Sequence, residues 1–85
     1  MAYYNFEEHV DMVRASRIAL TPLQRQVMEL VLAGLIQEEI GRRLGRSRRS
    51  VAGVVKRVCI KVGASNMQQA VAILVKLGEI GQKKR

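Results

Sequence analysis

Basic side chains gather in one stretch of this sequence, where their number and spacing point to a particular chemistry. Between Arg46 and Arg57 the chain carries five arginines and lysines and no acidic residue. Guanidinium and ammonium groups at this density bind phosphate oxygens through charge-assisted hydrogen bonds. Valines spaced by three and four residues interleave with them, which predicts a helix that is buried on one face. The opposite, basic face is therefore a candidate surface for a polyanion.

The residue types that serve acid–base, nucleophilic or metal chemistry are sparse and scattered. The single histidine, His9, lies far from the single cysteine, Cys59, and no catalytic triad or metal-ligand spacing surrounds either. Glu38 and Glu39 are adjacent, so they point apart on a helix and instead favour a helix start. We therefore expect no enzyme activity, no catalytic or metal-binding residues and no cofactor.

A short helix is predicted to position the basic one. It runs from Glu38 to Leu44 and is stopped by Gly45, because glycine adopts the left-handed conformation that closes helices. Ser47 is then the N-cap of a second helix, which spans Arg48 to about Val62. Two helices joined by a short turn containing glycine, the second one basic, are typical of a helix-turn-helix that places its second helix in the DNA major groove.

Two further helices are predicted ahead of this motif. Residues 3–18 form an amphipathic pattern, and we expect this helix to dock on the core because short helices rarely persist unpacked. Thr21 and Pro22 are a strong helix start, and Gln24 completes a capping box. That helix ends at Gly34.

A last helix is predicted over residues 66–77. Ser65 and Gln68 predict a second capping box at its start. Ile73 and Val75 fall outside its apolar core stripe on a helical wheel, so we expect both to be exposed. An apolar flank on a small protein favours self-association.

Size and charge fit this picture. The chain has 85 residues, a formal net charge of +8 and a pI near 10.6. Residues 1–20 sum to −1 and residues 21–85 to +9, which is the electrostatic footprint of a polyanion binder. We expect an N-terminal helix or arm over residues 1–19, one domain over 20–78, and a mobile basic tail over 79–85 whose Lys83, Lys84 and Arg85 attract phosphates.

From Leu20 to about Leu77 the chain resembles the DNA-binding domain of LuxR/FixJ-type response regulators. The similar positions are the ends of the family's first helix, its scaffold helix, the Ser-x-x-Thr-Val entry to its recognition helix, the Lys-Leu-Gly ending of that helix and the fourth helix. These positions are Leu20, Thr21, Pro22, Ala33, Gly34, Glu39, Ile40, Leu44, Ser47, Ser50, Val51, Lys61, Val62, Gly63, Ala70 and Val71.

The resemblance implies an all-α fold, namely a four-helix LuxR-type helix-turn-helix domain with an extra N-terminal amphipathic helix. It implies a transcriptional regulator that binds double-stranded DNA as a homodimer, with the third helix in the groove and the fourth forming the dimer interface. The candidate DNA-binding residues are Arg46, Ser47, Arg48, Arg49, Ser50, Ala52, Gly53, Lys56 and Arg57. The candidate dimer-interface residues are Val71, Ile73 and Val75.

We expect a stand-alone member of this family, because only about twenty residues precede the domain. No apolar run approaches the roughly 18 residues of a membrane span, and the acidic, aromatic N-terminus is no signal peptide. These features predict a soluble cytoplasmic protein that does not associate with a membrane. The resemblance implies that it is of bacterial or phage origin and associates with the nucleoid.

The chain departs from the family in its recognition helix. Ala52 and Val54 replace a lysine and a histidine that contact DNA in the family, whereas Lys56 falls where members often contact bases. Ala52 and Gly53 would allow close approach to thymine methyl groups, and Ile60 is left on the outward face.

These departures leave a second function class open, a protein-interaction module of the same fold. It would be an anti-activator that pairs with another LuxR-type regulator through the fourth helix, or a factor associated with RNA polymerase. The outward Ile60, Ile73 and Val75 motivate this alternative, and recovery of a hetero-complex that binds no DNA would favour it.

Overall fold

The computed structural model describes residues 3–82, which form five α-helices and no strand. The helices are α1 (Phe6–Ser16), α2 (Pro22–Leu32), α3 (Gln37–Leu44), α4 (Arg48–Val62) and α5 (Met67–Leu77). The all-α prediction is therefore confirmed, and so is the extra N-terminal helix. Lys83, Lys84 and Arg85 of the predicted basic tail lie outside the described residues.

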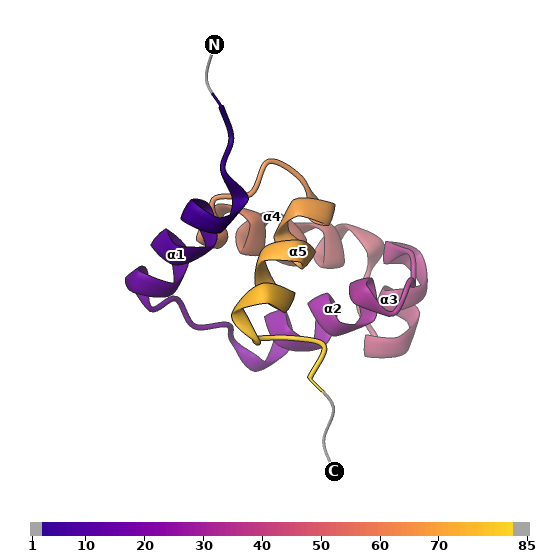
Figure 1. The fold of residues 1–85 in the computed structure, drawn as a ribbon. Helices are drawn as coiled ribbons and strands as arrows, with labels where there is room; N and C mark the ends of the chain where they lie inside the picture. Colours follow the sequence, from indigo (N-terminus) through magenta and orange to yellow (C-terminus); the bar gives the residue numbers. More distant parts are fainter. Residues whose placement is uncertain (1–2, 83–85) are drawn as a thin grey trace.

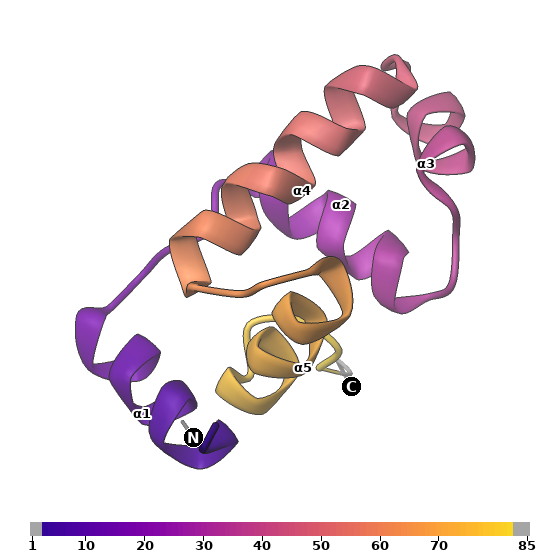
Figure 2. The same ribbon diagram turned by 90° about the horizontal axis from the view of Figure 1, so that it is seen from above.

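The longest helix, α4, is the central element against which most of the other helices pack (Figures 1 and 2). It packs against α2, α3 and α5, while α1 packs against α5 beyond the C-terminal end of α4. The principal extents of 40 × 37 × 20 Å describe a flattened body. One broad face of α4 is left uncovered by the other helices.

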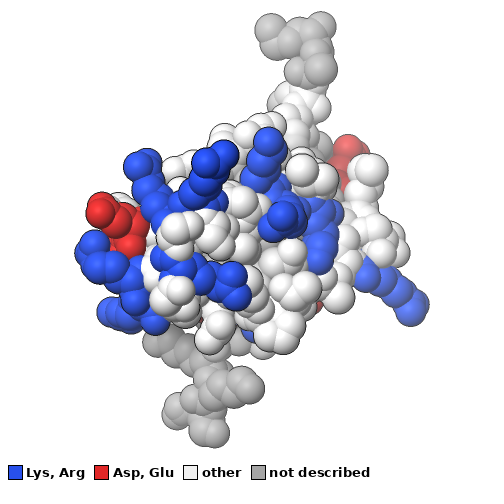
Figure 3. Space-filling view, turned by 180° about the vertical axis from the view of Figure 1, so that it is seen from behind, with Lys and Arg blue, Asp and Glu red and all other residues white. Residues whose placement is uncertain are grey.

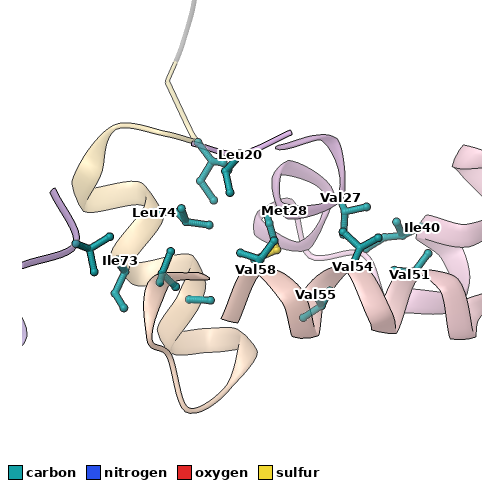
Figure 4. Close-up of a cluster of buried hydrophobic side chains, with 14 of the residues drawn as sticks. Leu20, Val27, Met28, Ile40, Val51, Val54, Val55, Val58, Ile73 and Leu74 are labelled. Atoms are coloured by element: carbon teal, nitrogen blue, oxygen red, sulfur yellow. The ribbon is translucent and has the colours of Figure 1, made fainter. Parts of the chain in front are cut away.

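The core consists of apolar side chains from all five helices, and the described residues include no buried polar or charged side chain. Figure 4 shows Met28 of α2 beside Val58 of α4, with Leu74 on the side of α5 that faces them. Aliphatic side chains of this size contribute about 1.5–3 kcal/mol each when fully buried. The core therefore fixes how α4 sits relative to α2 and α5.

Local sequence signals account for most helix ends. Thr21 Oγ1 accepts a hydrogen bond from Gln24 N–H, and Gln24 Oε1 accepts one from Thr21 N–H, each at 3.1 Å. This capping box of α2 confirms the prediction. The predicted box at Ser65 is wrong, because Asn66 is the N-cap of α5 and its Oδ1 accepts from Gln69 N–H at 2.8 Å. Gln69 then bonds back to Ser65 N–H, so the capping pair is shifted by one residue.

Helix α1 docks on the domain, as predicted. Val10 and Val13 are buried in the core. His9 Nε2 lies 2.9 Å from Val62 O, the last residue of α4, and donates to that carbonyl, while Tyr4 Oη lies 2.8 Å from His9 Nδ1. The histidine thus satisfies a carbonyl that the end of a helix leaves unpaired.

The segment after α5 folds back on α2 and is not a mobile tail over residues 79–82. Ile80 is only 1% exposed and belongs to the core. Glu79 receives hydrogen bonds from Arg25 at its carbonyl and carboxylate, and the Gly81 amide donates to the Glu29 carboxylate. The packed body therefore extends past the predicted boundary at residue 78.

Within residues 3–82, none of the helices is long and apolar enough by itself to cross a membrane. Helices α4 and α5 pass that test only as a pair, which is bent by 59°.

Candidate nucleic-acid interface

The turn between α3 and α4 sets the position of the basic helix. Gly45 closes α3 in the left-handed conformation with φ 67°, and the Arg46 amide donates to Gly41 O at 2.8 Å. Gly41 is fully buried, and a Cβ added there would overlap the carbonyl oxygen of Arg46. The turn therefore packs directly against the backbone of α3, as expected for a helix-turn-helix.

Both ends of α4 are held by local hydrogen bonds. Ser47 Oγ accepts from Ser50 N–H at 3.0 Å, which confirms Ser47 as the N-cap. Gly63 closes the helix with φ 67°. The predicted core face of α4 is also confirmed, because its five valines are all buried: Val51, Val54, Val55, Val58 and Val62.

The face of α4 opposite the valines carries most of the candidate residues. At about 100° per residue, Arg49, Gly53, Lys56 and Ile60 fall within an arc of about 60° and form one outward stripe. Arg49 and Lys56 are exposed, and Ile60 is 71% exposed. The stripe is about 16 Å long at a rise of about 1.5 Å per residue, which corresponds to about five base pairs at about 3.4 Å each.

Ala52 and Arg57 flank this stripe on its two sides. Ala52 is half-buried, as is Gly53, whereas Arg57 is exposed. Gly53 has an ordinary helical backbone, and a glycine in a helix interior costs about 1 kcal/mol relative to alanine. The stripe therefore carries cations on both sides of Gly53, where it is low in bulk, and ends in the apolar Ile60.

The remaining candidate residues lie at the N-terminal end of α4. Arg46 is exposed in the turn, and Arg48 is exposed on the side that borders the α2–α3 loop and the start of α5. Ser47 and Ser50 join in the cap, so their first role is to position the helix. Backbone N–H groups at a helix start attract phosphates, and the arginines here surround such a start.

Helix α3 adds two exposed arginines that the sequence analysis left out of the site. Arg42 and Arg43 occupy its last turn, and Arg42 makes only a loose ion pair with Glu38 at 3.8 Å. Two adjacent arginines are a visible signal in the sequence, but their place in the scaffold helix does not by itself indicate a ligand contact. Figure 3 shows Lys and Arg side chains gathered over the face that carries α4, with acidic side chains at its margins.

The candidate dimer-interface residues are not all on the surface. Ile73 was expected to be exposed, but it is 0% exposed and belongs to the core. The reason is that α1 packs against α5 in addition to α2 and α4, so more of α5 is covered than a single stripe. Val75 remains 43% exposed and Val71 is half-buried.

An apolar surface nevertheless links α5 to the end of α2. Leu32 is 39% exposed, and a Cβ added at Gly81 would lie 3.0 Å from Leu32 Cδ2 and 3.7 Å from Val75 Cγ2. Leu32 and Val75 thus flank the same glycine. Sequence reasoning missed Leu32 because the folding back of residues 79–82 brings these positions together.

Among the described residues, the groups that could titrate or react do not form a second site. Burial raises the pKa of the Cys59 thiol, which keeps it protonated at neutral pH. His9 is committed to Val62 and Tyr4. Across residues 3–82, His, Cys, Asp and Glu side chains form no group of three that could hold a metal ion.

A comparison with family models supports the helix-turn-helix assignment. The model described as "Bacterial regulatory proteins, luxR family" matches residues 19–74, which include α2, α3, α4 and most of α5. Comparisons with curated proteins and with solved structures gave no match. Because the matched region covers well over half of the 85 residues, the chain belongs to the luxR family of bacterial regulatory proteins, a DNA-binding and non-enzymatic family.

Proposed function

We propose that this protein is a sequence-specific DNA-binding transcriptional regulator that places α4 in the major groove. The observation that carries the proposal is the outward stripe of α4, with Arg49 and Lys56 one turn to either side of Gly53 and opposite the buried valines. A major groove about 12 Å wide admits a helix in this orientation. The long side chains of Arg49 and Lys56 then reach base edges.

The turn and the start of α4 fix the register on the phosphate backbone. Arg46 and Arg48 are exposed beside the free amides at the start of α4, an arrangement that binds phosphates and carries no sequence information by itself. Arg57, at the edge of the stripe, contacts the backbone on the other side of the groove. Arg42 and Arg43 of α3 extend this phosphate-binding surface.

We further propose that two copies pair through α5 and the end of α2. The proposed surface comprises Val71, Val75 and Leu32. It differs from the interface predicted from the sequence because Leu32 is exposed and Ile73 is buried. Two-fold pairing through one self-complementary patch is the commonest form of protein oligomer. Such a dimer reads two half-sites arranged as an inverted repeat.

The first test replaces Lys56 with alanine. We expect Lys56→Ala to lower the affinity for a selected specific duplex by about 1 kcal/mol or more, because a base contact is lost. Binding is measured by fluorescence anisotropy at near-physiological salt. The matched control is Lys76→Ala on α5, which removes the same charge from a lysine that lies near Glu7 and away from the stripe.

Equal effects of the two substitutions would show that only net charge matters, and unchanged specific binding by Lys56→Ala would show that α4 is misplaced in the groove.

The dimer is tested by sedimentation equilibrium of the wild type and of Val75→Glu with the selected duplex. We expect two wild-type chains per duplex and a weakened second binding step in the variant.

A further inference from the structure

Gly53 is unexplained by the fold. It lies in the middle of α4 with a helical backbone, so no turn or left-handed conformation requires glycine there. A Cβ added at this position would meet only the Arg57 guanidinium, with Nη1 4.0 Å away. The protein itself therefore has room for a side chain at position 53.

Gly41 shows the contrast within the same motif. A Cβ at Gly41 would overlap the Arg46 carbonyl oxygen, so the packing of the turn explains that glycine fully. No such neighbour exists at Gly53, although glycine weakens a helix interior. Packing within the described residues therefore does not require glycine at 53, and the open space leaves room for another molecule to approach the helix closely.

The surroundings of Gly53 indicate what that molecule is. Arg49 and Lys56, one turn to either side on the same stripe, are both exposed. This inference rests on the proposed function, in which the molecule that approaches the helix is DNA. The two cations then hold the DNA against α4 at Gly53. The half-buried Ala52 beside Gly53 keeps this part of the stripe low and apolar.

We propose that Gly53 is a specificity-determining residue that receives the C5 methyl group of a thymine. Glycine leaves space for one methyl group on the helix surface, between two side chains that contact neighbouring base pairs. In the major groove the thymine methyl is the apolar feature that distinguishes its base pair. The selected half-site therefore contains a thymine opposite Gly53, flanked by the positions that Arg49 and Lys56 contact.

The test is a methyl-exchange cycle on the duplex selected by the wild-type protein. Each thymine of the half-site is replaced in turn by deoxyuridine, which lacks only the methyl group, and binding is measured for wild type and Gly53→Ala. We expect the variant to lose about fivefold to 150-fold in affinity for the thymine duplex, the range that one mismatched base pair produces. Deoxyuridine at one position restores much of that loss, because the alanine methyl takes the vacated space.

Two controls separate groove contact from helix stability. Gly53→Ala raises the melting temperature of the free protein, since alanine is the better helix former. Gly53→Leu keeps a good helix former but adds bulk, so its affinity falls further and deoxyuridine does not rescue it. Ala15→Gly, at an exposed position of α1, lowers the melting temperature and leaves DNA affinity unchanged.

If wild type selects a site and both Gly53 variants bind it equally well, the assignment of Gly53 is overturned while the proposed function stands. Loss of binding by Gly53→Ala without rescue by deoxyuridine at any position overturns the methyl contact. If wild type selects no site at all, the proposed function fails first, and the inference fails with it.

Discussion

Gly41 and Gly53 both lie inside helices, but their neighbours decide whether the fold requires glycine at each position. Gly41 is buried against the Arg46 carbonyl, whereas Gly53 faces outward with open space around it. The sequence alone assigns Gly41 to the packing of the helix-turn-helix, and Gly53 to a helix interior where glycine costs about 1 kcal/mol relative to alanine. Only the contact across the turn separates a glycine needed by the fold from one free for recognition.

Replacement of Gly41 by alanine is expected to destabilise the domain strongly. The added methyl group collides with backbone that cannot move without displacing Arg46 and Ser47, and overpacking of this kind costs about 1–3 kcal/mol or more. Urea denaturation measures the loss. Gly53→Ala is the matched control with the opposite sign, and a Gly41→Ala protein as stable as wild type would contradict the described turn.

At the scale of single residues, the predicted N-cap is correct where only one residue at the helix start can act as a cap. Thr21 and Ser47 have no competing cap beside them, and both act as predicted. Ser65 and Asn66 are adjacent and both can cap. The choice between them depends on the path of the loop after α4, which the sequence does not encode locally.

At the scale of helices, α1 changes the interpretation of α5. A helical wheel assigns one buried stripe to α5, but α5 contacts α1 as well as α2 and α4. The burial of Ile73 follows from this second contact. Docking of α1 was predicted from its amphipathic pattern, yet the partner helix was not, because periodicity identifies an apolar face without identifying what covers it.

We expect α1 to be part of the cooperative folding unit. Val10→Ala removes about two methyl groups from a buried site, so it should lower the free energy of unfolding of the whole domain by about 2 kcal/mol in a single transition. Chemical denaturation followed by far-ultraviolet circular dichroism measures this change. Met12→Ala is the control on the same helix, where the side chain is 72% exposed.

Near-equal stability of the Val10→Ala and Met12→Ala proteins would contradict a docked α1. A two-step transition in wild type, with α1 melting first, would show that the helix folds separately from the rest.

At the scale of the whole molecule, the family match and the packed body have different limits. The match covers residues 19–74, whereas Val10 and Val13 before it and Ile80 after it are all buried in the core. The helix-turn-helix, its caps and its core face follow from local sequence patterns. The flanking segments pack through long-range contacts such as Arg25 with Glu79 and His9 with Val62, which no local pattern reveals.

The distribution of charge links this body to its proposed ligand. Acidic residues occupy the outer part of α1 and the start of α3, while the exposed face of α4 and the end of α3 are basic. The electrostatic field of this charge distribution orients the basic face of the protein toward DNA and accelerates association at low salt. It does not by itself select a sequence, so specificity has to come from the stripe on α4.

Selection from a random pool of short DNA duplexes, with the bound fraction sequenced at low and at near-physiological salt, tests the central claim most directly. The predicted result is an inverted repeat whose affinity survives near-physiological salt, because base contacts depend on salt less than phosphate contacts do. Weak binding that disappears with salt and enriches no sequence would contradict the claim. It would show that α4 contacts only phosphates, and it would favour a protein partner for the apolar surface around Val75.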